Sequence, residues 1–354
     1  MKICVYALCK NEEKNIPKWV ESMSEADAIY VLDTGSTDKS VEILRKLGVH
    51  VKQKIINPWR FDVARNESLA LVPSDTDIYV CTDIDERFEK GWRKKLQKYY
   101  SKEYTRVKYV YNWSFDTKGN PATTFYLNKI HNKNYKWINP VHEVLIALQD
   151  EKELLIEDII LNHYQDYTKN RSNYLPLLEL SVKENPLDDR NMHYLGREYM
   201  YYKMYDKCIE TLHKHLKLPS ATWKDERSAS MRYIARSYKN QNYHEEASLW
   251  YDLALNEAPY LRENYVEYAF YEYDNKNYEK AIKLLDEAFK ITKKSKSYIN
   301  ESYAWNYQIY DLYAICSYYL GNYKQAKKYN NLALKMEPTN QRLIDNAKFY
   351  NEKE

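Results

Sequence analysis

Two aspartates separated by one residue, Asp83 and Asp85, end an apolar run of the sequence. The run over 78–82 is rich in β-branched and aromatic residues, which is typical of a strand buried on both faces. Carboxylates at the end of such a strand need a cation or dense hydrogen bonding, and strand alternation would direct both to one side. Two acids with open positions around them suit Mg²⁺ or Mn²⁺, which keep sites for water and phosphate oxygens. The alternative is a helix start, because Asp85 and Glu86 precede a helix predicted over 90–99.

Strands and helices alternate along the first ninety residues, and they must position these acids. Short strands separated by helices predict a mostly parallel α/β sheet, in which ligands lie outside the carboxyl ends of the strands. The predicted strands cover 3–8, 29–32, 49–55 and 78–82, and the predicted helices cover 15–23, 39–46 and 61–71.

Polar residues follow three of these strands, at Lys10–Glu13, Asp33–Asp38 and Asp83–Asp85. We expect the three strand ends to share one cleft. Turn and capping chemistry explains Gly35 and Asp38 but leaves Asp33 without a structural role. The six glycines of the chain are all isolated, which excludes the glycine-rich phosphate loops of Rossmann and P-loop sites. Any phosphate chemistry must therefore use metal and side chains.

Composition narrows the class of protein further. The 54 Lys and Arg against 51 Asp and Glu leave a net charge of +3, which argues against a nucleic-acid partner. The five cysteines are odd in number and scattered, as in a reducing compartment. With no signal peptide and no run of membrane length, we expect a cytoplasmic protein without a membrane span. A chain of 354 residues suits two domains.

The pattern changes along the rest of the chain. Strands are predicted over 106–113, 123–130 and 154–162, and from residue 185 onward the chain is helical throughout. Ala247 and Ala281 are 34 residues apart, the period of a tetratricopeptide repeat, and we expect four such units. Small residues let the paired helices approach, and the many tyrosines fill the grooves, a minority of them lining a peptide-binding or homodimer surface.

The ordered motifs of the chain resemble those of family 2 glycosyltransferases with the GT-A fold. The residues that carry the resemblance are Lys10–Asn15, Leu32–Asp38, Ala64–Asn66 and Asp83–Glu86, with Val141–Glu143 and His163–Tyr164 similar to a branch that includes lipopolysaccharide-core glucosyltransferases and bacterial enzymes with tetratricopeptide tails. The resemblance implies a Rossmann-like mixed-sheet GT-A domain over 1–170. An all-α tetratricopeptide-repeat solenoid is expected over 171–354.

The resemblance also implies roles for single residues. Asp33 is expected to meet the uracil ring of a UDP-sugar, and Arg65, whose alternative is an exposed helix charge, to reach the nucleotide. Asp83 is expected to face the ribose or the waters of the metal. The metal, Mn²⁺ or Mg²⁺, is assigned to Asp85 and to His163, whose alternative is a purely structural histidine. The other residues expected to bind the donor are Ala7, Asn11 and Glu12.

Glu143 is the residue expected to act as general base. Inverting transfer needs one carboxylate to take the proton from the acceptor while a metal stabilises the leaving diphosphate. His142–Glu143 departs from the Glu-Asp pair that is commoner in the family, and the alternative for Glu143 is an ordinary surface residue.

The sequence therefore predicts an inverting, metal-dependent glycosyltransferase that moves a hexose from a UDP-sugar to a polypeptide side chain or a surface glycan precursor. Its repeats are expected to bind the acceptor or a protein partner. One alternative is a catalytically silent nucleotide-binding scaffold whose repeats mediate protein contacts. Another, a sugar nucleotidyltransferase, requires a glycine-rich loop after the first strand, where this chain has Lys10–Glu13.

Overall fold

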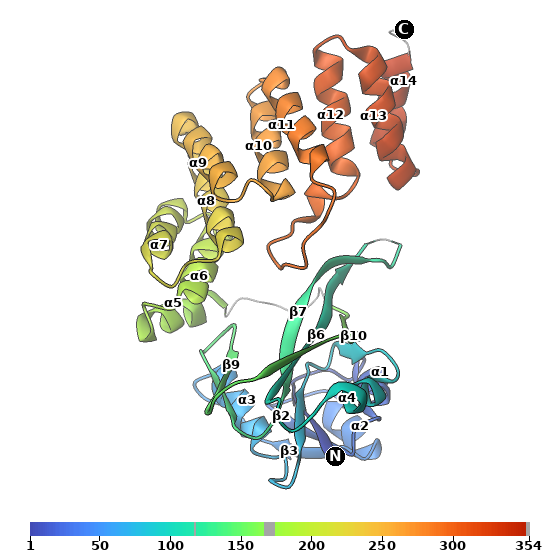
Figure 1. The fold of residues 1–354 in the computed structure, drawn as a ribbon, viewed down its shortest axis with the longest axis vertical. Helices are drawn as coiled ribbons and strands as arrows, with labels where there is room; N and C mark the ends of the chain where they lie inside the picture. The colour runs from blue at the N-terminus through green and yellow to red at the C-terminus, as the bar shows by residue number, and fades with distance from the viewer. Residues whose placement is uncertain (117, 166–173, 352–354) are drawn as a thin grey trace. The chain divides into compact units, whose positions relative to one another are not determined.

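A computed structural model describes residues 1–116, 118–165 and 174–351 of the chain. The chain divides into two compact units, coloured along the sequence in Figure 1. The first comprises Met1–Glu184 with Lys296–Tyr298, and the second comprises Asn185–Ser295 with Ile299–Glu354. The predicted domain boundary at residues 170 and 171 lies outside the described residues.

The first unit is built on a mixed sheet of eight described strands, in the order β3-β2-β1-β4-β7-β6-β10-β5. Strands β3, β2, β1 and β4 are parallel to one another. Strand β7 is antiparallel to both of its neighbours, and β5 is antiparallel to β10 at the edge of the sheet. This confirms the predicted GT-A-like mixed sheet. The strands are β1 (Ile3–Cys9), β2 (Ala28–Asp33), β3 (His50–Gln53), β4 (Ile78–Cys81), β5 (Glu86–Phe88), β6 (Arg106–Phe115), β7 (Pro121–His131) and β10 (Glu153–His163).

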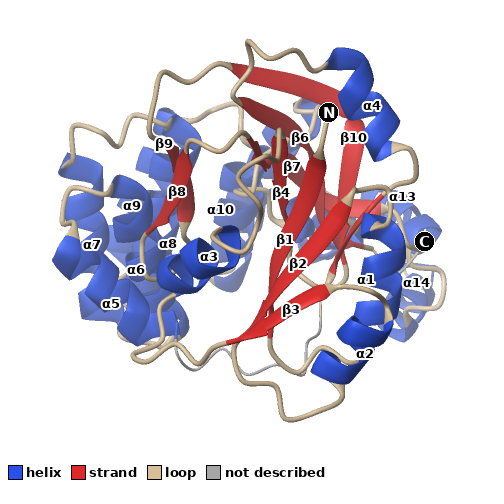
Figure 2. Ribbon diagram, turned by 90° about the horizontal axis from the view of Figure 1, so that it is seen from below, coloured by secondary structure: helices blue, strands red, loops and turns tan. Residues whose placement is uncertain are grey.

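Both faces of the central strand β1 are buried, which is why its sequence is apolar without alternation. Ile3 and Val5 face a core shared with α1, whose buried Ile16 and Trp19 lie on one helical stripe. Tyr6 faces the opposite core, formed with α3 and a small hairpin; α1 and α3 lie on different sides of the sheet in Figure 2. The other elements of this unit are α1 (Ile16–Met23), α2 (Ser40–Lys46), α3 (Phe61–Leu69), α4 (Trp92–Tyr99), α5 (Tyr174–Glu184) and the hairpin β8 (Tyr135–Ile138) with β9 (Val144–Ala147).

A buried polar chain crosses the second of these cores. The Trp137 indole donates to the Tyr6 hydroxyl at 2.9 Å, and that hydroxyl lies 2.9 Å from His131 Nε2. His131 Nδ1 lies 2.5 Å from the Asn132 carbonyl, which accepts only, so Nδ1 carries the proton and Nε2 accepts from Tyr6. Burial lowers the pKa of His131 to about 3, and the imidazole is therefore neutral in the native fold.

The second unit is a succession of helices that pack in consecutive pairs, and its described residues form four such pairs followed by α14. This confirms a helical region that resembles tetratricopeptide-repeat proteins. Small residues are needed where the two helices of a pair pack closely. At Gly196 of α6, a Cβ atom would overlap the side chain of Leu212 on α7. The pairs are α6 (Asp189–Tyr201) with α7 (Tyr205–Lys217), α8 (Lys224–Asn240) with α9 (His244–Glu257), α10 (Arg262–Asp274) with α11 (Tyr278–Lys290), and α12 (Tyr307–Tyr319) with α13 (Tyr323–Met336); α14 is Gln341–Asn351.

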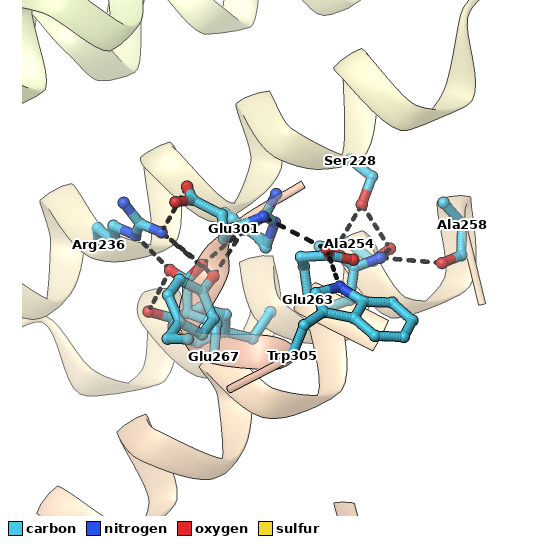
Figure 3. Close-up of polar contacts among 12 residues, drawn as sticks. Ser228, Arg236, Ala254, Ala258, Glu263, Glu267, Glu301 and Trp305 are labelled. Atoms are coloured by element: carbon cyan, nitrogen blue, oxygen red, sulfur yellow. Dashed lines mark hydrogen bonds and ion pairs between the residues drawn. The ribbon is translucent and has the colours of Figure 1, made fainter. Parts of the chain in front are cut away.

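Polar groups also connect neighbouring helix pairs within this unit (Figure 3). Arg236 of α8 donates through Nε to Glu267 of α10 at 2.5 Å, and its Nη2 lies 3.5 Å from Glu301. The Trp305 indole donates to Glu263 at 2.6 Å. Among the described helices of both units, none combines the length and the apolar content needed to cross a bilayer.

Candidate active site

The three polar loops predicted to meet do lie at one edge of the sheet. Cys9 at the end of β1 pairs with Asp33 at the end of β2, and Tyr6 pairs with Cys81 at the end of β4. The first two loops are joined directly, because the Asn11 amide donates to Ser36 Oγ at 2.9 Å. Parallel pairing in this register is what collects the loops at the carboxyl ends of the strands.

Asp83 and Asp85 lie in the turn between β4 and β5, not on a strand. Strand alternation therefore does not orient them, and the prediction that both point to one side for that reason is wrong. The helix-capping alternative is wrong as well, because the N-cap of α4 is Gly91 and Glu86 belongs to β5. The turn instead directs the two carboxylates to different partners.

Asp83 faces two cations. Its Oδ1 accepts from Arg65 Nη2 at 2.5 Å, and its Oδ2 lies 3.5 Å from Lys129 Nζ. Burial raises the pKa of Asp83, but the charges of Arg65 and Lys129 outweigh burial and hold that pKa well below its usual value. Asp83 is thus an anion that two basic side chains fix in place.

Arg65 connects Asp83 to the predicted base. Its side chain is only 4% exposed, and its Nε donates to Glu143 Oε1 at 2.9 Å, so the exposed-charge alternative is wrong. The guanidinium lies over the Trp137 ring, 5.5 Å from the ring centroid. Burial lowers the pKa of Arg65, but the nearby acids and the Cys81 thiol raise it well above its usual value. One buried cation therefore holds Asp83 and the predicted base together.

Glu143 precedes β9 and is not an ordinary surface residue. Its carboxylate is 12% exposed and paired with Arg65. His142 next to it adopts a positive φ of 49°, so the chain turns sharply just before Glu143. The surface alternative is therefore wrong, while the role of base stays a prediction.

Asp85 lies against His163, at the end of β10. His163 Nε2 is 3.3 Å from Asp85 Oδ2, and its ring stacks on Trp113 at a centroid distance of 4.5 Å. His163 Nδ1 lies 3.0 Å from the Trp113 carbonyl, which accepts only, so Nδ1 carries a proton. In the neutral imidazole, a lone pair on Nε2 then faces a carboxylate oxygen.

This arrangement fits a divalent cation. Two lone pairs at 3.3 Å repel unless a proton or a cation lies between them. Ligands bound to one Mg²⁺ at about 2.1 Å and at a right angle are about 3 Å apart, which is close to the observed separation. Burial lowers the pKa of His163, but the hydrogen bond and the charge of Asp85 raise it above its usual value. The same negative charge attracts a metal.

The first two loops hold the remaining predicted residues. Asp33 is fully buried, and its Oδ1 accepts from the amides of Gly35 and Ser36, both at 3.2 Å. The expectation that turn chemistry leaves Asp33 without a structural role is therefore wrong. Asn11 accepts from the Thr37 amide at 2.8 Å and has a positive φ of 56°, which asparagine tolerates better than most residues.

Ala7 and Glu12 have local structural surroundings. Ala7 is buried in β1 and pairs with Val31. The Glu12 amide donates to Ser40 Oγ at 2.8 Å, and its Oε2 accepts from Asn15 at 3.1 Å. Both residues belong to the strand and the loop that form this edge, and their contacts with a donor stay predictions.

Lys129 is the charged residue that sequence reasoning missed. It lies on β7, next to the apolar Ile130, and its side chain is 19% exposed. Burial lowers its pKa, but the charges of Glu86 and Asp83 raise it well above the usual value. A lysine near the end of a predicted apolar strand is the signal that points to it.

Comparisons with known proteins agree with this geometry. The family model of "Glycosyl transferase family 2" matches residues 4–146. An "Uncharacterized glycosyltransferase" of Rickettsia bellii (strain RML369-C) is 31% identical over 97 residues, which cover 27% of this chain and 32% of that protein. The chain thus matches about a third of the length of this curated relative.

Several solved structures are similar to about half of the chain. MamA has a TM-score of 0.39 at 16% identity and covers 51% of this chain and 99% of its own. YrrB, described as a TPR protein with an unusual peptide-binding site, has a TM-score of 0.38 at 10% identity, covering 50% and 83%. PilF of Pseudomonas aeruginosa has a TM-score of 0.39 at 12% identity, covering 51% and 72%. Because these scores are low, the repeat architecture rests on the helix pairs of this chain.

The sheet order, the acids collected at its carboxyl edge and the family match concern the same part of the molecule. Residues 4–146 of this chain match the family model of glycosyl transferase family 2, and a run of paired helices follows them.

Proposed function

We propose that the protein is an inverting glycosyltransferase that moves a hexose from a UDP-sugar to an acceptor and uses a divalent metal. The observation that carries the proposal is the connected set of charges in which Arg65 pairs with both Asp83 and Glu143. The turn of Asp83 also places Asp85 against His163. One buried side chain thereby joins the acid that we assign to the donor side and the carboxylate that we propose as the base.

Asp85 and His163 are the residues that would hold Mn²⁺ or Mg²⁺. When bound, such a cation stabilises the negative charge that develops on the departing diphosphate. Asp83, held by Arg65 and Lys129, is assigned to the ribose or to waters of the metal. The loop of Asn11 and Asp33 is already ordered by its own hydrogen bonds, so it offers a preformed surface for the nucleoside.

Glu143 is assigned to take the proton from the acceptor. Arg65 occupies one oxygen of this carboxylate at 2.9 Å, and a carboxylate has a second oxygen that can accept the proton. Arg65 keeps Glu143 in one orientation, which favours a base that must meet the acceptor at hydrogen-bond distance. A catalytically silent scaffold has no need for such a base, and no observation favours that alternative.

The acceptor is proposed to be a polypeptide side chain or a surface glycan precursor. The helix pairs of the second unit are proposed to bind the acceptor or a protein partner, or to form a homodimer. The support for a protein partner is the repeat architecture, because helix-pair repeats expose extended binding surfaces.

Two variants test the donor side and the acceptor side separately. Asp85→Asn removes one charge at the cation site, so Mn²⁺-dependent binding of UDP, measured by calorimetry, should weaken at least tenfold. Asp150→Asn is the matched control, because Asp150 is an exposed acid of the same unit. If Asp85→Asn binds UDP in Mn²⁺ as tightly as the wild type does, with the same gain over binding without Mn²⁺, the metal assignment is rejected.

Glu143→Gln keeps the size of the side chain and removes the base. It should bind UDP as the wild type does and should lose transfer from a panel of UDP-sugars by about 100-fold or more. Transfer at the wild-type rate would remove Glu143 from the mechanism.

A further inference from the structure

Two buried histidines and one buried glutamate meet in the helical unit, outside the site described above. His193 on α6 and His215 on α7 are both 0% exposed, and Glu226 on α8 is 4% exposed. One ligand atom from each of the three side chains lies within 4.8 Å of the other two. The three residues come from successive helices that pack against one another.

A single hydroxyl orients both imidazole rings. Ser230 Oγ lies 2.7 Å from His193 Nδ1 and 3.0 Å from His215 Nδ1. With a metal on both Nε2 atoms, both Nδ1 atoms carry a hydrogen, and the two lone pairs of the hydroxyl oxygen accept from both. Without metal, the hydroxyl can instead donate to one Nδ1, and that ring then carries its hydrogen on Nε2. Ser230 therefore pairs with both Nδ1 atoms in either state, and the partners of the two Nε2 atoms remain to be identified.

Neither Nε2 atom makes a hydrogen bond to a described residue, although both are buried. His215 Nε2 lies 3.3 Å from Glu226 Oε1, without the geometry of a hydrogen bond. Buried polar atoms in native proteins are nearly always paired, so two unpaired nitrogens on neighbouring rings require an explanation. An ordinary core histidine would satisfy both of its nitrogens.

A metal ion provides that explanation. Metal-binding histidines characteristically use one ring nitrogen as ligand and engage the other in a hydrogen bond that fixes the ring, which is the role of Ser230 here. Two imidazoles and a carboxylate are a ligand set that Zn²⁺ accepts. Ligands at about 2.1 Å around a tetrahedral ion are about 3.4 Å apart, so the three side chains need to close by little more than 1 Å.

We propose that His193, His215 and Glu226 bind one Zn²⁺ ion that joins α6, α7 and α8. The three ligands leave a fourth position for a water molecule. Because the ligands are buried and come from two successive helix pairs, the ion is structural, and it fixes the first pair of the array against the second. This site does not depend on the proposed transferase activity, and its test is separate from the tests of that activity.

The test uses the full chain in an Asp85→Ala background, which removes the other cation site. After chelator treatment and loading with Zn²⁺, gel-filtered protein should retain one zinc per chain by elemental mass spectrometry. His193→Gln and Glu226→Gln should retain none after the same filtration. His213→Gln is the matched control, because His213 is also on α7 but lies outside the cluster, edge-on to Trp250; it should retain one zinc.

A second measurement separates ligation from folding. Ser230→Ala keeps all three ligands and removes only the orienting hydroxyl, so its affinity for Zn²⁺ should fall about 10- to 100-fold with unchanged helical circular dichroism. Substituted Co²⁺ should give the visible absorption bands of a low-coordinate site in the Asp85→Ala chain and lose them in Glu226→Gln. The proposal is overturned if a folded Asp85→Ala chain retains no zinc, or if all variants retain the same amount of zinc.

Discussion

Replacing Arg65 with Met should destabilise the first unit strongly, and the structure gives the magnitude. The Arg65 side chain is 4% exposed and bridges Asp83 and Glu143. Removing one partner of a buried ion pair costs about 3–5 kcal/mol, because the remaining charge stays buried and unpaired. Asp83 is 36% exposed and keeps Lys129 at 3.5 Å, so most of the penalty comes from Glu143, which is 12% exposed. We therefore expect the lower end of the range, about 3 kcal/mol.

Hydrogen exchange measured by mass spectrometry is the suitable assay. The chain has two units, so a single unfolding midpoint does not report on one of them alone. Peptides that cover α3 and β4 report the local opening free energy next to Arg65. A loss of about 3 kcal/mol should speed their exchange on the order of 100-fold, since about 1.4 kcal/mol corresponds to a factor of ten.

Two further variants make this prediction refutable. Arg93→Met removes a half-exposed pair with Asp27 in the same unit, so it should cost about 1 kcal/mol or less. Adding Glu143→Gln to Arg65→Met removes the orphaned charge and should recover about 1–2 kcal/mol. If Arg65→Met exchanges like the wild type, or if the double variant recovers nothing, Arg65 is not the buried link described above.

Two other predictions concern stability. Because the pKa of His131 falls from 6.5 in the unfolded chain to about 3 in the fold, stability is full above pH 6.5 and is lost as pH falls toward 3, by at most about 1.4 kcal/mol per pH unit. His131→Gln should flatten the pH dependence of the opening free energy that hydrogen exchange reports for peptides of β1 and β7, and an unchanged pH dependence would assign the effect to other groups. Gly196→Ala should lower the opening free energy that hydrogen exchange reports for peptides of α6 and α7, because its Cβ overlaps Leu212 and overpacking costs about 1–3 kcal/mol. Adding Leu212→Ala should relieve the overlap, and wild-type exchange rates in Gly196→Ala alone would contradict this packing.

Local patterns predicted the regular elements of this protein well. The run of β1 and the apolar stripe of α1 carry their own periodicity, and the alternation of such segments requires a parallel sheet. The helix pairs were predicted for the same reason, since Ala247 and Ala281 recur at a fixed spacing. The edge strand β5, which has only three residues, and the β8–β9 hairpin were missed.

The site was only partly predictable, because its contacts span large distances along the chain. Arg65 and Glu143 are 78 residues apart, and nothing local indicates that they touch. The alternation rule failed for Asp83 and Asp85 because these residues lie in a turn. Two aspartates around an isoleucine are not a sequence signal for a turn. Lys129 was missed because a lysine on a strand usually faces solvent.

The central place of β1 has a consequence for how the protein is made. β1 pairs with β2 on one side and with β4 on the other, and β4 ends at Cys81. A ribosome adding 5–20 residues per second needs about 4–15 s to produce the intervening segment. During that interval the apolar Ile3–Cys9 has an open edge on the growing chain, whereas each helical pair can close as soon as its second helix emerges. Synthesis speed over the first eighty codons should therefore govern the yield of active protein more than speed over the repeats.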